Sequence, residues 1–312
     1  MRPVPEAGAH QPVRSPVAAI DCGTNTIKLL IGELPDVAVR ETRIVRLGQD
    51  VDRTGRLADE ALVRAFAAID EYAALIAEHG VPASRIRFCA TSASRDAANA
   101  DVFTSGVRAR LGVTPEVIAG PAEAALAFDG AVRNLRTPPV APVLVVDIGG
   151  GSTELILGAS EPESAHSMDI GSVRMHERHL RSDPPTADEV AACVADVDAH
   201  LDSCPVDPAP AATVVGVAGT VTTVAAAVLD LPAYDRDAID QAVLAVADVH
   251  AAVDRLLAMT VAERRALPYM AAGREDVIGA GALILSRVLR RTRVDSLVVS
   301  ESDILDGIAW SI

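Results

Sequence analysis

Two stretches of the chain repeat one pattern of apolar and polar positions. The first is VAAIDCGTNTIKLLIG, residues 17–32, and the second is VLVVDIGGGSTELILG, residues 143–158. In each stretch an apolar run leads to an aspartate, a short turn of glycine and hydroxyl-bearing residues follows, and a second apolar run begins. Apolar runs of this length bounded by glycine turns predict buried strands. The chain is therefore expected to contain the same β-hairpin twice.

The rest of the chain alternates between strand-like and helix-like periods. Strands are expected at residues 37–47, 85–90, 113–119, 165–169, 214–219 and 296–299. Helices are expected at residues 59–77, 120–135, 187–201, 246–259, 277–289 and 304–310, with another starting at Thr220. The helix at 59–77 shows a clear period, because its apolar residues recur every three or four positions. Strands alternating with helices in both halves predict an α/β protein.

The length of 312 residues favours two domains over a single core. The segment 137–142, TPPVAP, is the expected linker. We expect an N-terminal domain over 16–135 and a C-terminal domain over 136–301, with a helix at 302–312 that packs back on the first domain. Residues 1–15 lack the apolar core of a signal peptide and are expected to form a disordered tail. No apolar run has the length that spanning a membrane requires.

The charge balance disfavours several classes of partner. The chain has 43 acidic and 28 basic residues and a formal charge of -15, which argues against a general nucleic-acid or anionic-membrane binder. Aromatic residues make up 3% of the chain, too few to suggest stacking platforms for single-stranded nucleic acid. Four dispersed cysteines without metal-ligand spacing predict reduced thiols and a cytoplasmic protein.

A polyanionic ligand would therefore have to be bound by a local basic cleft. Arg40, Arg43 and Arg46 follow one another along the strand expected at 37–47. Arginines spaced in this way are typical of the exposed edge of a sheet. Most arginines of this kind are solvated edge charges, and we favour that interpretation here.

The glycine turns suit an anionic ligand. Residues without Cβ, such as Gly149, Gly150 and Gly151, let several backbone N–H groups converge on one oxygen, and phosphate fits such a nest of donors. Asp147 and Glu154 bracket this turn and are candidates for holding a hard cation such as Mg2+. The alternative is an ordinary glycine hairpin with two solvated acids.

The two hairpins align without a gap and differ in charge at one position. The aligned pairs are Asp21 with Asp147, Gly23 with Gly149, Thr26 with Ser152, and Lys28 with Glu154. A cleft between the hairpins would offer a cation to phosphate from one wall and a carboxylate to metal or water from the other. Lys28 is the only lysine in the chain, and it follows Thr26 by two residues, which is the same face of a strand. A plain exposed strand position is the alternative for Lys28.

Three further segments carry candidate residues. Arg95 follows the hydroxyls of the segment TSAS, which are either phosphate-facing or plain helix caps. Glu123 lies in the first turn of the helix expected at 120–135, where the helix dipole alone also favours an acid. Gly219 and Thr220 open a helix after a strand, and such helix N-termini bind phosphate or serve as packing turns.

Six segments of the chain occur in the order expected of one family. They are Asp21-Cys-Gly-Thr-Asn-Thr26, Ala90-Thr-Ser-Ala-Ser-Arg95, Gly120-Pro-Ala-Glu123-Ala, Asp147-Ile-Gly-Gly-Gly-Ser-Thr-Glu154, Ala218-Gly-Thr220 and Arg274-Glu-Asp-Val-Ile-Gly279. From about Val17 to the C-terminus, the chain resembles the exopolyphosphatase/guanosine pentaphosphatase family, and within it the short actinobacterial exopolyphosphatases.

The resemblance implies an actin-like, ribonuclease H-like fold of the sugar kinase/actin superfamily. Two α/β domains would surround a cleft, each with a mixed five-stranded sheet. The implied activity is the release of terminal phosphate from inorganic polyphosphate with Mg2+, or with Mn2+ as the other candidate metal. The family also suggests a homodimer.

The resemblance assigns roles to residues at matching positions. Glu123 would be the general base, Arg95 would assist, and Asp147 and Glu154 would form the metal and water site. The phosphate-binding residues would be those of the two turns, Asp21, Gly23, Thr24, Asn25 and Thr26 in the first, and Gly149, Gly150, Gly151, Ser152 and Thr153 in the second.

The chain departs from the family's pattern at two places. Many relatives have two adjacent glutamates where this chain has Ala122 and Glu123, so only Glu123 can be the base. A Leu-Arg-Glu-Gly pattern is replaced by Ile-Leu-Asp-Gly at residues 304–307, which removes one arginine near the cleft.

Three other functions fit parts of the pattern. A guanosine pentaphosphate 5′-phosphohydrolase would use the same site on a nucleotide tail. An actin-like small-molecule kinase would use the same turns, but it also needs an acceptor-site aspartate and an adenosine pocket, for which the Gly219-Thr220 turn is the one candidate. A non-catalytic actin-like binding module would not need Glu123 and Arg95 beside the turns.

Overall fold

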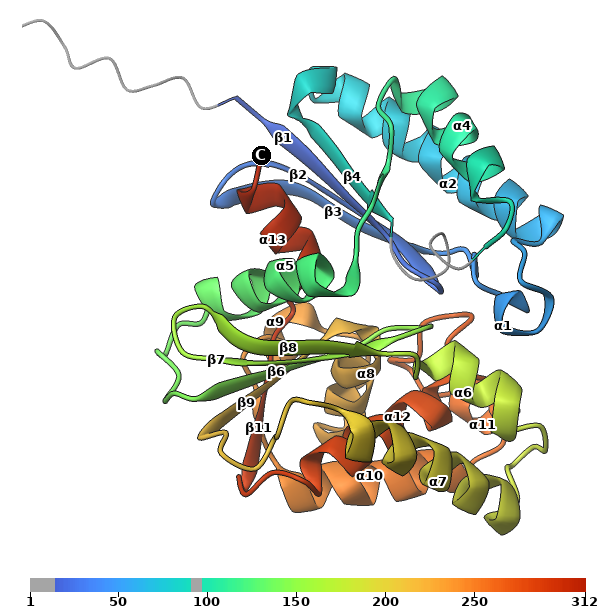
Figure 1. The fold of residues 1–312 in the computed structure, drawn as a ribbon, viewed down its shortest axis with the longest axis vertical. Helices are drawn as coiled ribbons and strands as arrows, with labels where there is room; N and C mark the ends of the chain where they lie inside the picture. Colours follow the sequence, from blue (N-terminus) through green and yellow to red (C-terminus); the bar gives the residue numbers. More distant parts are fainter. Residues whose placement is uncertain (1–14, 91–96) are drawn as a thin grey trace, which may run out of the picture.

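The structure is a computed structural model that describes residues 15–90 and 97–312 (Figure 1). Two mixed β-sheets form its centre, and helices cover their outer faces and fill the space between them. This arrangement confirms the expected α/β class. The predicted tail at 1–15, apart from its last residue, lies outside the described residues, and so does Arg95.

The first sheet has the strand order β3-β2-β1-β4-β5. Its strands are β1 (Val17–Cys22), β2 (Thr26–Glu33), β3 (Asp36–Ile44), β4 (Ile86–Ala90) and β5 (Glu116–Val117). The helices of this half are α1 (Val51–Thr54), α2 (Asp59–Glu78), α4 (Ala100–Leu111) and the 3₁₀ turn η1 (Ala83–Arg85). α2 and α4 cover the outer face (Figure 1). The strand expected at 113–119 is shorter than predicted, because only residues 116 and 117 pair with β4.

The second sheet has the strand order β10-β11-β9-β6-β7-β8. Its strands are β6 (Val143–Ile148), β7 (Thr153–Gly158), β8 (Pro162–Met168), β9 (Thr213–Val217), β10 (Val243–Ala245) and β11 (Ser296–Val299). Its helices are α6 (Ser172–His179), α7 (Ala187–Ser203), α8 (Ala218–Val228), α9 (Arg236–Ile239), α10 (Val246–Ala258), α11 (Val261–Arg265) and α12 (Ile278–Leu289). The expectation of five strands is wrong for this sheet, because β10 adds a sixth by pairing antiparallel with β11.

The duplicated hairpin predicted from the sequence is present in the structure. β1 and β2 pair Asp21 with Lys28, and β6 and β7 pair Asp147 with Glu154, in the same register. Directly opposite residues of an antiparallel pair share one face of the sheet. Each hairpin therefore carries an aspartate and a second charged residue side by side, next to its turn.

Two helices lie between the sheets, α5 (Gly120–Arg133) and α13 (Ile304–Trp310) (Figure 1). One apolar cluster joins them to both sheets; its members include Ala19, Leu30, Phe128, Val145, Val215 and Ile308. The C-terminal helix thus packs against α5 and against β1 of the first sheet. The division of the chain into domains at residues 135 and 136 stays a prediction.

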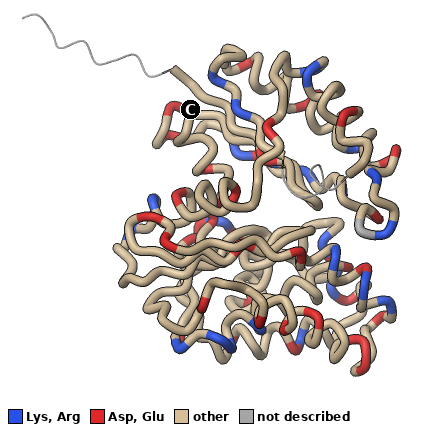
Figure 2. Tube along the Cα trace, viewed as in Figure 1, with Lys and Arg blue, Asp and Glu red and all other residues tan. Residues whose placement is uncertain are grey.

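Charges of both signs are interspersed over the described part of the chain, rather than gathered into one basic face (Figure 2). Because no basic face gathers on the surface of these described residues, a polyanionic ligand is expected to meet its cations inside the fold.

Across residues 15–90 and 97–312, no helix combines the length and the apolar character needed to cross a membrane.

Candidate active site

A cavity of about 630 Å³ opens next to both hairpin turns. The predicted site residues that line it are Asp21, Gly23, Thr24, Asn25, Thr26, Lys28, Glu123, Asp147, Gly149, Gly150, Gly151, Ser152, Glu154, Gly219 and Thr220. The structure does not bring Thr153 to the cavity, because its side chain is fully buried and donates a hydrogen bond to the Ile170 carbonyl oxygen at 2.7 Å. Arg95 lies outside the described residues.

Each turn is closed by an equivalent internal hydrogen bond, and the two turns contact each other. The Gly23 N–H donates to the Thr26 carbonyl oxygen at 2.9 Å, and the Gly149 N–H donates to the Ser152 carbonyl oxygen at 3.0 Å. A Cβ on Gly150 would lie only 3.0 Å from a side-chain atom of the first turn, Asn25 Cβ. Glycine at this position therefore lets the turns approach, so that backbone donors of both border one cavity.

Asp147 and Glu154 are adjacent and almost completely buried, with exposed fractions of 7% and 2%. Burial, followed by the neighbouring Glu154, raises the pKa of Asp147 well above its usual value. The Ser167 hydroxyl donates to Glu154 Oε1 at 2.6 Å. In the first hairpin, burial raises the pKa of Asp21 to about 6, although Lys28 opposes the shift. Among the described residues, nothing donates a hydrogen bond to the buried Asp21 Oδ1.

These carboxylates fit a hard divalent cation. Carboxylates whose charged form is disfavoured by burial are stabilised when a cation binds beside them. In the described part of the chain, no three His, Cys, Asp or Glu side chains form a metal-binding group by themselves. Mg2+ is commonly held by one or two carboxylates together with water and substrate phosphate. The Asp147 and Glu154 pair therefore suits a metal that is shared with a phosphate ligand.

Glu123 reaches the cavity from the first turn of α5. It is buried, with 6% of the residue exposed. α5 begins at Gly120, where a Cβ would lie 3.0 Å from Ser167 Cβ on β8. This close contact with β8 fixes the start of the helix, and with it the direction in which Glu123 points.

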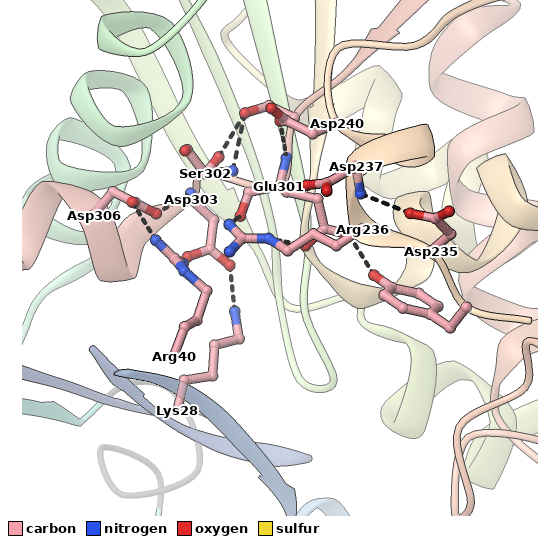
Figure 3. Close-up of polar contacts among 12 residues, drawn as sticks. Lys28, Arg40, Asp235, Arg236, Asp237, Asp240, Glu301, Ser302, Asp303 and Asp306 are labelled. Atoms are coloured by element: carbon pink, nitrogen blue, oxygen red, sulfur yellow. Dashed lines mark hydrogen bonds and ion pairs between the residues drawn. The ribbon is translucent and has the colours of Figure 1, made fainter. Parts of the chain in front are cut away.

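The structure adds cavity residues to which the sequence pattern gave no role at the site, namely Arg40, Tyr234, Arg236, Arg274, Glu301 and Asp303. Figure 3 shows several of them around Lys28. The Lys28 Nζ lies 2.5 Å from Asp303 Oδ2 and 3.7 Å from Asp21 Oδ2. Asp303 lies 275 positions from Lys28, so no local pattern could have paired them.

Two of the three arginines interpreted as solvated edge charges are instead paired with the second half of the chain. Arg40 forms an ion pair with Asp306 (Figure 3), and Arg46 forms one with Asp276 at 2.9 Å. Arg43 stays partly exposed. The interpretation is wrong for Arg40, because its part of β3 borders the cavity rather than open solvent. It is also wrong for Arg46, which follows β3 and is paired with Asp276 of the second half of the chain.

Arg274 supports the third glycine turn. Its Nη1 donates to the Gly219 carbonyl oxygen at 3.0 Å and to Thr223 Oγ1 at 2.8 Å. Burial lowers the pKa of this guanidinium. These contacts hold the turn that brings Gly219 and Thr220 to the cavity wall.

Two mixed sheets, with equivalent hairpins that meet at one cavity, define an actin-like protein. Each strand and helix is formed by consecutive residues, whereas the site combines residues from both halves of the chain. The chain belongs to the Ppx/GppA phosphatase family, whose sequence model matches residues 30–312.

Relatives of known name or structure agree with this assignment. Exopolyphosphatase 2 of Mycobacterium tuberculosis is 48% identical, over 95% of this chain and 98% of its own length. The crystal structure of an exopolyphosphatase-like protein has a TM-score of 0.91 at 47% identity, and covers 95% of this chain and 98% of its own. The Ppx/GppA family member of Aquifex aeolicus has a TM-score of 0.80 at 31% identity, and covers 95% and 97%. Phosphatases of this family generally depend on a divalent metal ion.

Proposed function

We propose that this protein is an exopolyphosphatase, which hydrolyses the terminal phosphoanhydride bond of inorganic polyphosphate. One observation carries the proposal: both glycine turns, the buried Glu123 and the Asp147 and Glu154 pair border a single cavity. The name of the 48% identical relative, Exopolyphosphatase 2, supports the same reaction.

In the proposed reaction, a water oxygen attacks the terminal phosphorus, the bond to the bridging oxygen breaks, and the shortened polyphosphate leaves with that oxygen. Glu123 would orient the water and take its proton. The backbone N–H groups of the turns and the Lys28 ammonium would hold the terminal phosphate oxygens. Arg95, by its place in the family motif, would add a further positive charge.

Asp147 and Glu154 would hold the metal, Mg2+ or Mn2+. When bound, such an ion supplies charge neutralisation for the phosphate oxygens. The protein contributes two adjacent carboxylates beside the second turn, and the Ser167 hydroxyl orients one of them.

Phosphate release from polyphosphate and from guanosine pentaphosphate, measured side by side with Mg2+ and with Mn2+, tests the proposal. The nucleotide is included because Tyr234, which is 41% exposed, lines the same cavity and would give a base a ring to stack on. Faster release from polyphosphate supports the proposal. Release from the nucleotide alone would replace the proposed substrate, and release from neither would reject the proposed activity.

Replacing either carboxylate of the pair should raise the Mg2+ concentration needed for half-maximal activity. For Asp147→Asn and Glu154→Gln we expect an increase of about tenfold or more, which is what losing even a supporting contact to a metal typically costs. Excess Mg2+ should restore part of the activity of Glu154→Gln. Asp129→Asn, which removes a partly exposed carboxylate of α5, is the control. An unchanged Mg2+ titration in both cavity variants would place the metal elsewhere.

A further inference from the structure

Lys28 is held by a carboxylate from the other end of the chain. Its side chain is 15% exposed, and its Nζ lies 2.5 Å from Asp303 Oδ2 and 3.7 Å from Asp21 Oδ2. All three residues line the cavity of the proposed active site. Burial disfavours the ammonium, but Asp303, Asp21 and Asp147 together raise the pKa of Lys28 above its usual value. Lys28 therefore stays charged inside the cavity.

Asp303 is itself held in place by the helix that follows it. It is the N-cap residue of α13, and its Oδ1 accepts a hydrogen bond from the Leu305 N–H at 3.0 Å. The Asp303 N–H donates to Asp306 Oδ2 at 2.9 Å, and Asp306 forms the ion pair with Arg40 (Figure 3). Lys28 and Arg40 lie on the paired strands β2 and β3. Two cations from one sheet thus hold the start of α13.

The two carboxylates nearest to Lys28 differ in the direction of their pKa shifts. Burial opposes ionisation of Asp303, but Lys28 and Arg40 outweigh it and hold the pKa of Asp303 below its usual value. Burial prevails at Asp21, whose pKa rises to about 6. Asp303 is therefore the stronger partner of the ammonium. An ammonium on a long flexible stem would otherwise lose rotamer entropy each time it was fixed at a ligand.

We propose that Asp303 is a positioning residue, which holds the Lys28 ammonium at the cavity wall where it meets a phosphate oxygen of the substrate. The inference rests on the proposed function, because Lys28 needs a phosphate ligand in the cavity. An ammonium has three N–H donors, so a contact with Asp303 leaves two for other acceptors. Without Asp303, the Lys28 ammonium would be drawn to Asp21, the next carboxylate at 3.7 Å, and would lose its fixed place at the cavity wall.

Two simpler roles for Asp303 predict different results. If Asp303 only caps α13, its loss changes stability but not the KM for polyphosphate. If it only adds negative charge to the cavity, its loss weakens the repulsion of a polyanion and lowers the KM. Glu301 is the matched control, because it lies on the same segment and lines the same cavity, but pairs with Tyr234 and Arg236 instead of Lys28.

Asp303→Asn is the test variant, because asparagine is as good an N-cap as aspartate but gives Lys28 no charged acceptor. We expect the KM for polyphosphate to rise about fivefold or more with kcat within about threefold of wild type, because a charge-assisted contact is weakened while the base is untouched. Glu301→Gln should not raise the KM. Equal KM changes in both variants, or a fall for Asp303→Asn, would overturn the proposal. If Asp303→Asn does not fold, Asp303→Ser becomes the test variant, because serine keeps a capping oxygen.

A double-mutant cycle with Lys28→Met separates positioning from a structural role. Lys28→Met should itself raise the KM, and adding Asp303→Asn in that background should change the KM by less than about twofold. The double variant should also unfold at a higher temperature than Lys28→Met, because it no longer leaves a buried carboxylate without its ammonium. Multiplicative effects of the two substitutions on the KM would mean that Asp303 does not act through Lys28.

The proposed function and this inference fail in distinguishable ways. If the wild-type protein releases no phosphate from polyphosphate, the proposed function fails. The double-mutant cycle then uses the affinity for tripolyphosphate, measured by calorimetry, of the wild type, the two single variants and the double variant. Non-additive losses of tripolyphosphate affinity then support the positioning role of Asp303. Additive losses overturn it, and so does the absence of tripolyphosphate binding by the wild-type protein.

Discussion

Glu123→Gln should leave the fold intact and lower the turnover of polyphosphate by about a hundredfold or more, the lower end of what a positioned general base contributes. The substitution keeps the shape of the side chain and removes its ability to take a proton. Glu123 is buried at the cavity, in the first turn of α5, so an amide of the same size fits the site. The measurement is kcat from phosphate release at saturating Mg2+.

Glu163→Gln is the matched control, because it makes the same chemical change on an exposed part of β8, outside the cavity. Both variants should unfold at the wild-type temperature, and only Glu123→Gln should lose turnover. A folded Glu123→Gln protein with turnover near that of the wild type would show that another residue is the base.

The two departures from the family's pattern differ in their place relative to the cavity. Ala122 is exposed on α5 and does not line the cavity, whereas Glu123 does. At the position of the family's arginine, Leu305 lines the cavity, but it is 1% exposed and belongs to the apolar cluster between the sheets. Arginines from other elements line the cavity, namely Arg40, Arg43, Arg236 and Arg274. They offset the loss of positive charge expected from the pattern.

The hairpins and the main helices could be predicted because their information is local. A buried apolar run beside a glycine turn marks a strand wherever the rest of the chain goes. The capping box of Thr186 and Glu189 at the start of α7 is equally local. The alternation of side chains along a strand also explains an exception: Thr153 of β7 does not face the cavity, and Glu154, the next residue, does.

The contacts around Lys28 could not be predicted, because they join distant parts of the chain. Arg40 and Asp306 are 266 positions apart, and Lys28 and Asp303 are 275 apart. The packing of α13 between the sheets, and not proximity in the sequence, determines which carboxylate pairs with which cation. β10 was missed for another reason, because residues 243–245 are too few to show a period.

The packing of α13 depends on two glycines where it crosses α5. A Cβ on Gly307 of α13 would lie 2.0 Å from the Leu126 carbonyl oxygen, and a Cβ on Gly130 of α5 would lie 1.9 Å from the Asp303 carbonyl oxygen. Both obstructing atoms belong to the backbone, so no side chain can move aside. An alanine at either position must force apart the two helices that fill the space between the sheets.

Gly307→Ala should therefore lower the free energy of unfolding by about 3 kcal/mol or more, the upper end of the usual cost of overpacking. Denaturant unfolding measures this change. Gly112→Ala is the control, because Gly112 has φ +70 with nothing within 4 Å of an added Cβ, and so carries only the left-handed backbone cost of about 1–2 kcal/mol. Since α13 follows Asp303, a folded Gly307→Ala protein should also show the raised KM expected for Asp303→Asn. Stability equal to that of Gly112→Ala would mean that α5 and α13 can separate freely, and that their crossing does not fix Asp303.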